Sequence, residues 1–221
     1  MMLTDLADAC RKSGLTVVEV AGWRTRGHGQ LAAVRTIVAH HTATPAAAPG
    51  NYPSMRVVRD GRSDLAGPLA NLGLGRDGTV YVIAAGIGYH AGKVRERDYG
   101  NAYSIGIEAE HPGVGVWPAA QYDAYARLCS ALCKHYDVSV SGVLGHKEVC
   151  APVGRKSDPN FPMEDFRTAV GRATPLPAKK TRPEKVRAAI KLLREQLKTA
   201  GPVQKARINA AIAKLREIGK K

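Results

Sequence analysis

The sequence predicts an α/β domain, with a central, mostly buried β-sheet flanked by helices, followed by a basic helical hairpin. Two observations support this fold class. Short runs rich in β-branched residues alternate along the chain with stretches whose apolar residues recur every three or four positions. Four Cys in 221 residues are too few for a disulfide-built scaffold, so a hydrophobic core must hold the domain together.

The first half of the chain predicts one helix and three strands. Helical spacing of apolar residues marks the helix, and runs such as TVVEV and TVYVIAA mark the strands. The third strand follows the turn signal Arg76-Asp77-Gly78, so a hairpin is expected there. A Pro- and Ala-rich loop, TATPAAAPGNYPS, separates the second strand from this hairpin. The helix covers residues 3–13, and the strands cover residues 16–20, 34–39 and 79–85.

The second half of the domain predicts two strands and two helices. The run YSIGIEA is apolar enough at its centre for a strand that is buried on both faces. From Pro118 onward, Tyr, Leu and Cys residues recur at spacings of three and four, which indicates a helix. A polar loop with Gly and Pro separates the last strand from the last helix. The strands cover residues 103–109 and 140–144, the helices 118–135 and 163–173, and the loop 147–162.

The C-terminal region predicts a linker and a pair of helices. Three prolines in ATPLPAKKTRP indicate a linker at residues 173–183, between a domain at residues 1–172 and a hairpin at residues 184–221. The two helices are broken at Gly201-Pro202 and contain the similar strings IKLLRE and IAKLRE. Each helix is marginal alone, so we expect pairing within the chain or self-association of two chains.

The net charge of +14 is carried almost entirely by the last fifty residues. Residues 172–221 contain 15 Lys or Arg and 3 Glu, whereas residues 1–171 contain 18 bases and 16 acids. The chain is therefore a nearly neutral domain with a cationic tail, and such tails usually bind polyanions. The tail has no aromatic residue, which disfavours nucleic acid as the polyanion because base stacking is unsupported.

The composition excludes several classes of protein. Apolar residues make up 44% and charged residues 24%, as in ordinary globular domains, which excludes disorder over the whole chain. No apolar run approaches the roughly 18 to 20 residues of a membrane span. The start, MMLTDLADACRKSG, has acids where a signal peptide has bases and lacks an apolar core. We therefore expect the protein to be cytoplasmic when it is synthesised.

Three residues in the predicted loops and strand ends could form a metal site. His40 follows the strand TIVA, His146 follows VLG, and Asp158 comes twelve residues after His146. Two neutral imidazoles and one carboxylate are the ligands of many catalytic zinc sites with an open fourth position. Such a zinc ion lowers the pKa of water to roughly 7 and polarises carbonyl groups, which suits amide hydrolysis.

Six ordered motifs give the chain a resemblance to a known family. They are VAHHTAT, GRDGTVYVIAAG, YHAGK, NAYSIGIEAE, GHKEV and GRKSDP, and they cover about residues 30–170. In this order they resemble the zinc-dependent N-acetylmuramoyl-L-alanine amidases of the amidase-2 type, which share a fold with peptidoglycan recognition proteins. The nearest likeness is to phage endolysins that attack actinobacterial walls.

The resemblance implies one Zn²⁺ per chain, held by His40, His146 and Asp158. His41 is the alternative to His40, and Cys150 lies where it could be mistaken for the third ligand. Lys156 matches the family's lysine that stabilises the oxyanion on the attacked carbonyl, where a fixed cation would oppose the developing negative charge.

Further roles follow from the same resemblance. Some branches use a catalytic Tyr where this chain has Ala70, and the branch without that Tyr uses a Glu that matches Glu108. Glu110 lies two residues on and is expected on the same strand face, so only one of the two is expected to reach the site. His90 and Asn101 match residues that bind substrate along the groove.

The implied function is zinc-dependent hydrolysis of the amide between N-acetylmuramic acid and L-alanine in peptidoglycan, in a phage endolysin that lyses its host. The alternatives are a bacterial wall-recycling amidase and a non-catalytic peptidoglycan-binding protein of the same fold. Peptidoglycan is the expected partner, and the basic tail at residues 184–221 is expected to bind anionic wall polymers. The protein would then act on the wall after its release from the cytoplasm.

Overall fold

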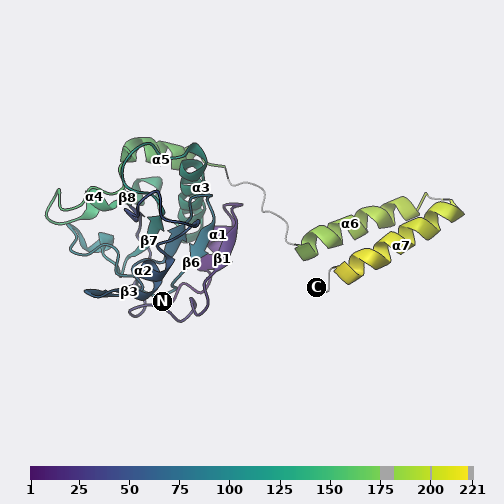
Figure 1. The fold of residues 1–221 in the computed structure, drawn as a ribbon, viewed down its shortest axis with the longest axis horizontal. Coiled ribbons are helices and arrows are strands. Elements are labelled where there is room, and N and C mark those ends of the chain that lie inside the picture. The colour runs from purple at the N-terminus through teal and green to yellow at the C-terminus, as the bar shows by residue number, and fades with distance from the viewer. Residues whose placement is uncertain (175–181, 200, 219–221) are drawn as a thin grey trace. The chain divides into compact units, whose positions relative to one another are not determined.

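A computed structural model describes residues 1–174, 182–199 and 201–218 (Figure 1). The chain divides into two compact units, Met1–Ala178 and Lys179–Lys221. The predicted linker at residues 173–183 lies largely outside the described residues, so its conformation stays a prediction. Among the described residues, no helix has the length and apolar character needed to cross a membrane.

A six-stranded sheet forms the centre of the first unit, in the order β1-β6-β5-β7-β2-β8. Only β5 and β6 pair antiparallel, and all other neighbours run parallel. A separate two-stranded sheet joins β3 to β4. The strands are β1 (Val17–Glu19), β2 (Thr36–His41), β3 (Gly61–Arg62), β4 (Leu65–Ala66), β5 (Leu72–Leu74), β6 (Val80–Val82), β7 (Ser104–Ala109) and β8 (Val143–Gly145).

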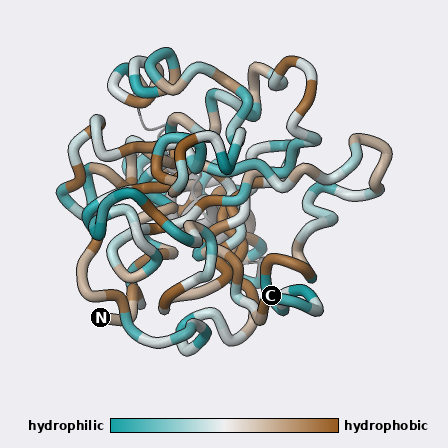
Figure 2. Tube along the Cα trace, turned by 90° about the vertical axis from the view of Figure 1, so that its left-hand side faces the viewer, coloured by the Kyte–Doolittle hydropathy of each residue, from teal (hydrophilic) through white to brown (hydrophobic). Residues whose placement is uncertain are grey.

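The helices of the first unit share one large core with the sheet. Its apolar side chains come from α1, α3 and α5 and from alternate positions of the central strands, such as Ile37 and Ala39 on β2 and Ile107 on β7. Figure 2 colours the chain by hydropathy and shows apolar stretches, in brown, interspersed with hydrophilic ones, in teal. The helices are α1 (Leu6–Arg11), α2 (Met55–Asp60), α3 (Ala119–Tyr136), α4 (His146–Val149) and α5 (Met163–Arg172), with 3-10 turns η1 (Arg97–Tyr99) and η2 (Val140–Gly142).

The predicted fold class, a buried sheet flanked by helices, is confirmed. The hairpin expected at Arg76-Asp77-Gly78 is confirmed, because β5 and β6 pair antiparallel across this turn. The structure adds elements that the sequence patterns did not predict: α2, α4 and the β3–β4 pair. Each is six residues or shorter, too short for a hydrophobic period to emerge. The single turn α4 forms because the backbone N–H of Gly145 donates a 2.8 Å hydrogen bond to Glu148. The residues expected as a strand at 140–144 divide into η2 and the start of β8.

The buried tyrosine Tyr125 of α3 links the ends of β2 and β7. Its hydroxyl accepts a 3.0 Å hydrogen bond from the backbone N–H of His40. The same hydroxyl lies 3.0 Å from the carbonyl oxygen of Ile107, to which it can donate. Sequence periodicity assigned Tyr125 only to an apolar helix face, so its polar role emerges from the tertiary structure.

Replacing Tyr125 with phenylalanine is expected to lower the free energy of unfolding by about 1 to 3 kcal/mol, because the buried N–H of His40 loses its acceptor. Urea denaturation measures this change. Tyr122→Phe is the matched control on the same helix, because within the described residues the Tyr122 hydroxyl makes no hydrogen bond. Equal effects of the two substitutions would contradict the structural role of the Tyr125 hydroxyl.

The second unit contains two helices, α6 (Arg182–Leu197) and α7 (Pro202–Ile218), that pack against each other. Ile208 and Ile212 of α7 are buried, each less than 8% exposed. Proline is favoured at the first position of a helix, and α7 begins at Pro202, where the break was expected. The predicted pairing within the chain is therefore present in the described residues.

Candidate active site

The site lies where β2 and β7 end. The two strands are parallel neighbours, and their register pairs His40 directly with Glu108. Because side chains alternate along a strand, His40 and Glu108 point away from the face that carries Ile37 and Ile107 into the helical core. Ligand sites of open α/β sheets commonly form at these carboxyl ends of the strands.

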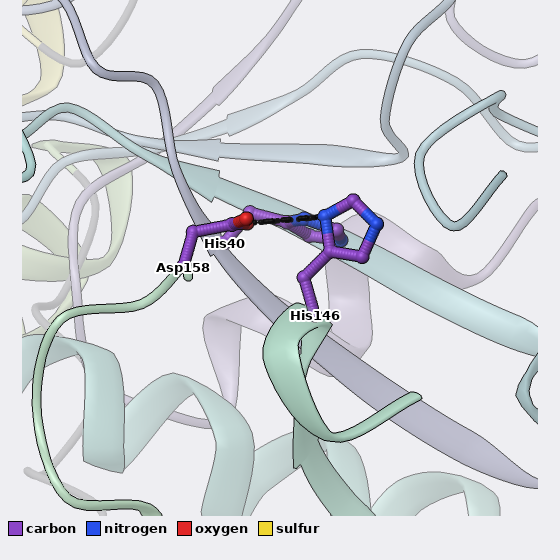
Figure 3. Close-up of side chains that lie close together, drawn as sticks. All are labelled: His40, His146 and Asp158. Atoms are coloured by element: carbon purple, nitrogen blue, oxygen red, sulfur yellow. Dashed lines mark hydrogen bonds and ion pairs between the residues drawn. The ribbon is translucent and has the colours of Figure 1, made fainter. Parts of the chain in front are cut away.

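His40, His146 and Asp158 converge on one point, although His40 precedes His146 by more than a hundred residues (Figure 3). The Nδ1 atoms of the two histidines lie 3.0 Å apart. The Oδ2 atom of Asp158 lies 3.0 Å from Nδ1 of His40 and 3.2 Å from Nδ1 of His146. His40 extends from β2, His146 begins α4, and Asp158 comes from the loop before α5.

The hydrogen bonds around this cluster indicate that unprotonated ligand atoms face one another, an arrangement that a cation would stabilise. The Nε2 atom of His146 lies 3.1 Å from the carbonyl oxygen of Ala91, which can only accept a hydrogen bond. The proton of a neutral His146 is therefore on Nε2, and its Nδ1 presents a lone pair to the carboxylate of Asp158. Lone pairs in close contact repel one another unless a positive charge lies between them.

The donor set fits zinc. Zinc–ligand distances of roughly 2.0 to 2.2 Å in a tetrahedral arrangement separate ligand atoms by roughly 3.3 to 3.6 Å, slightly more than the 3.0 to 3.2 Å between these three atoms. Burial lowers the pKa of His40 to about 4, which keeps the imidazole neutral and able to bind metal. Burial opposes ionisation of Asp158, but the two adjacent histidines hold its pKa below the ordinary value.

Glu108 lies beside this cluster without a hydrogen-bond partner on one of its oxygens. Its Oε1 is 3.9 Å from Nδ1 of His40, and its buried Oε2 contacts no donor in the described part of the chain. Burial, together with repulsion from the carboxylate of Asp158, raises the pKa of Glu108 to about 8. A carboxyl group with a raised pKa next to a reacting centre is suited to accept and return a proton near neutral pH.

A cavity of about 950 Å³ opens over the cluster, and it is lined by Glu108, His146, Lys156 and Asp158 among others. Lys156 is exposed on the loop that carries Asp158, and its charge acts on both His40 and Glu108. The structure thus brings five of the predicted site residues, these four and His90, to one cavity wall beside buried His40. The cavity is large enough for a peptide-sized substrate.

His90 and Asn101 occupy different positions relative to the cavity. His90 is 6% exposed and forms part of the cavity wall, with its Nδ1 3.2 Å from Nε2 of His40. Asn101 is outside the described cavity lining, and its side-chain oxygen accepts hydrogen bonds from the backbone N–H groups of His90 and Ala91.

The alternative ligands lie outside the cluster. The cluster of potential ligand atoms found in the described residues includes neither His41 nor Cys150. Cys150 is a free, buried thiol whose sulfur contacts the carbonyl oxygens of Lys147 and Pro152. Glu110 also lies apart, because its carboxylate accepts hydrogen bonds from Thr42 and Ser54.

The fold and the site define a mixed α/β domain with a candidate metal centre built from two histidines and a carboxylate. The chain belongs to the Amidase_2 family, the N-acetylmuramoyl-L-alanine amidases, whose profile matches residues 30–161. The protein is therefore an N-acetylmuramoyl-L-alanine amidase, and its substrate is peptidoglycan. The resemblance that the six sequence motifs indicated is confirmed.

Solved structures share this fold. A selenomethionine derivative of AmpD is 25% identical in sequence, with a TM-score of 0.52 over 71% of this chain and 94% of that chain. The endolysin amidase LysCS from Clostridium intestinale (21% identity, TM-score 0.52) shares the fold over 71% of this chain and 95% of its own. The catalytic domain of XlyA (20% identity, TM-score 0.52) does so over 71% of this chain and 100% of its own. No curated protein sequence matches this chain.

Proposed function

We propose that this amidase depends on zinc and hydrolyses the amide between the lactyl group of N-acetylmuramic acid and the L-alanine of the stem peptide. The convergence of two imidazole nitrogens and one carboxylate oxygen within 3.2 Å, at the wall of a cavity, carries the proposal. Zinc bound there would supply Lewis acidity and lower the pKa of water at the site.

The residues around the cluster supply the remaining chemistry. Glu108, whose raised pKa and free oxygen suit it as a base, accepts a proton from the attacking water and returns it to the leaving amine. Lys156 lines the same cavity and presents an exposed ammonium group that stabilises negative charge on the attacked carbonyl oxygen. His40, His146 and Asp158 hold the metal and fix its position relative to these two groups.

The test is to measure the zinc content of the purified protein together with the new chain ends released from cell wall. An amidase yields about one zinc per chain, new L-alanine amines and no new reducing sugar ends. New reducing ends would indicate cleavage between sugars instead, and zinc-free protein with full amine release would refute the metal's role.

We further propose that the enzyme is lytic, in the manner of an endolysin, and not an enzyme of wall recycling. The basic second unit supports this proposal, because a cationic hairpin would concentrate the enzyme on an anionic wall and would not help it to act on small soluble fragments. Such an enzyme would stay in the cytoplasm until the membrane opens. A higher rate on soluble muropeptides than on intact walls would contradict the lytic role.

The hairpin's charge is testable in the full chain. Lys191, Lys205 and Lys214 are exposed on α6 and α7, so replacing all three with glutamine should leave the packing intact. We expect retention on walls rich in anionic polymer to fall several-fold at low salt. The difference should disappear near 1 M salt, where the Debye length is about 3 Å. Changing the same lysines to arginine is the matched control, and equal loss in both variants would exclude a charge effect.

A further inference from the structure

We infer that the backbone segment His90–Ala91, held by Asn101, fixes the tautomers of both imidazoles in the proposed zinc site. This inference rests on the proposed function, because it concerns how the chain presents its ligands to the metal. It makes His90 and Asn101 positioning residues, whereas the sequence resemblance assigned them to substrate binding.

The carbonyl group of Ala91 fixes the tautomer of His146. The carbonyl oxygen of Ala91 lies 3.1 Å from Nε2 of His146 and can only accept a hydrogen bond. The neutral ring therefore carries its proton on Nε2 and directs the Nδ1 lone pair toward Asp158. Metal-binding histidines commonly donate their second ring nitrogen to a backbone carbonyl in this way, which fixes both the tautomer and the ring orientation.

The tautomer of His40 is fixed through a chain of hydrogen bonds that includes Ser104 and His90. The hydroxyl of Ser104 lies 2.8 Å from the carbonyl oxygen of Gly100 and gives its single proton to that acceptor. Ser104 Oγ must then accept from Nε2 of His90, 3.3 Å away. A neutral His90 consequently has an unprotonated Nδ1, which accepts a hydrogen bond from Nε2 of His40 at 3.2 Å.

His40 therefore has the same tautomer as His146, with its proton on Nε2. Because Nε2 of His40 donates to His90, its Nδ1 is unprotonated and directs a lone pair to the same point. Both ligands are thereby prepared for a metal without a change of tautomer.

Two further contacts hold the segment His90–Ala91 in place. The side-chain oxygen of Asn101 accepts hydrogen bonds from the backbone N–H groups of His90 at 3.1 Å and Ala91 at 2.8 Å. Gly106 of β7 lies directly against the His90 ring, where a Cβ atom would come within 2.4 to 2.8 Å of the ring atoms. The same short segment therefore sets the positions of both the imidazole and the carbonyl oxygen.

The positioning role of His90 and Asn101 can be tested by measuring the zinc affinity of matched variants of the full chain. His90→Leu removes the acceptor for His40, whereas His90→Asn retains an oxygen near the position of Nδ1. We expect His90→Leu to weaken zinc binding about 10- to 100-fold in a chelator competition, and His90→Asn to restore most of that loss. Asn101→Leu and Asn101→Asp form a second pair, because the aspartate keeps the oxygen that accepts from both N–H groups.

A substrate-binding role would give a different result. If His90 and Asn101 only contacted substrate, His90→Leu and Asn101→Leu would raise KM and leave zinc affinity unchanged. That outcome in correctly folded variants would overturn the inference. Weaker zinc binding, with rescue by His90→Asn and Asn101→Asp, would support it.

The tautomers themselves can be measured without metal. In metal-free protein labelled with ¹⁵N-histidine, long-range proton–nitrogen correlation spectra should show His40 and His146 protonated on Nε2. Ser104→Ala should add the other tautomer at His40 and leave His146 unchanged, since Ala91 still accepts from it. Nδ1 protonation of either residue in the wild type would overturn the inference. A wild type that binds no zinc would refute the proposed function, and the tautomers would still decide this inference.

Discussion

Replacing Asp158 with alanine is expected to abolish both stoichiometric zinc binding and amidase activity. The substitution removes the only carboxylate among the three ligand atoms and leaves two neutral imidazoles. Loss of an outer hydrogen-bonding partner typically costs 10- to 100-fold in metal affinity, so loss of a direct ligand should cost more than about 100-fold. Metal analysis after dialysis and release of L-alanine amines from purified wall measure the two effects.

Asp165→Ala is the matched control for this experiment. Asp165 is an exposed carboxylate in the first turn of α5, seven residues beyond Asp158 in the chain, and it is not part of the ligand cluster. Its replacement should keep zinc and activity at wild-type levels. Chelation of the wild type should reproduce the Asp158→Ala defect, and added zinc should reverse chelation but not the substitution. An Asp158→Ala protein that keeps one tightly bound zinc would refute the ligand assignment.

Glu108→Gln is expected to lower kcat by about 10²- to 10⁴-fold and to leave zinc content unchanged. Loss of a general acid–base group costs about this much, and glutamine keeps the shape of the side chain while it cannot accept the proton of water. The side chain lies 3.9 Å from Nδ1 of His40, beyond the separation of the three ligand atoms. Steady-state kinetics and metal analysis of the same preparation separate the two effects.

Glu110→Gln is the matched control for Glu108→Gln, because Glu110 lies two residues further along the chain. The Glu110 carboxylate is 1% exposed and accepts hydrogen bonds from the hydroxyls of Thr42 and Ser54 and from the backbone N–H of Ser54. Its replacement should cost about 1 to 3 kcal/mol of stability and change kcat little. If Glu110→Gln lost kcat while Glu108→Gln kept it, the assignment of the base to Glu108 would be wrong.

Much of the fold could be predicted from the sequence because its major elements have strong periodic patterns. The eighteen-residue helix α3 and the apolar strand β7 were both predicted to within one residue. Elements of six residues or fewer, such as α2 and α4, have no comparable pattern and depend on tertiary contacts. Strand β2 was predicted at residues 34–39 and lies at Thr36–His41, because its last residues are histidines and not β-branched.

The identity of the candidate site followed from the sequence because its residues stand in ordered motifs. His40, His146 and Asp158 could be predicted as a metal-binding cluster, and the structure brings their ligand atoms together. The catalytic roles of Glu108 and Lys156 remain predictions. The sequence also showed that almost all of the net positive charge lies in the last fifty residues. These features depend on residue type and order, which a sequence states directly.

The tertiary structure decided the properties that depend on distance and burial. Pairing of β2 with β7 places His40 beside Glu108, and burial raises the pKa of that carboxyl group. His90 contacts the ring of His40, and the carbonyl oxygen of Ala91 contacts the ring of His146. We infer that these two contacts determine which ring nitrogen of each imidazole carries a proton. No local pattern encodes these contacts, because they join segments separated by fifty residues or more and exist only once the sheet has formed.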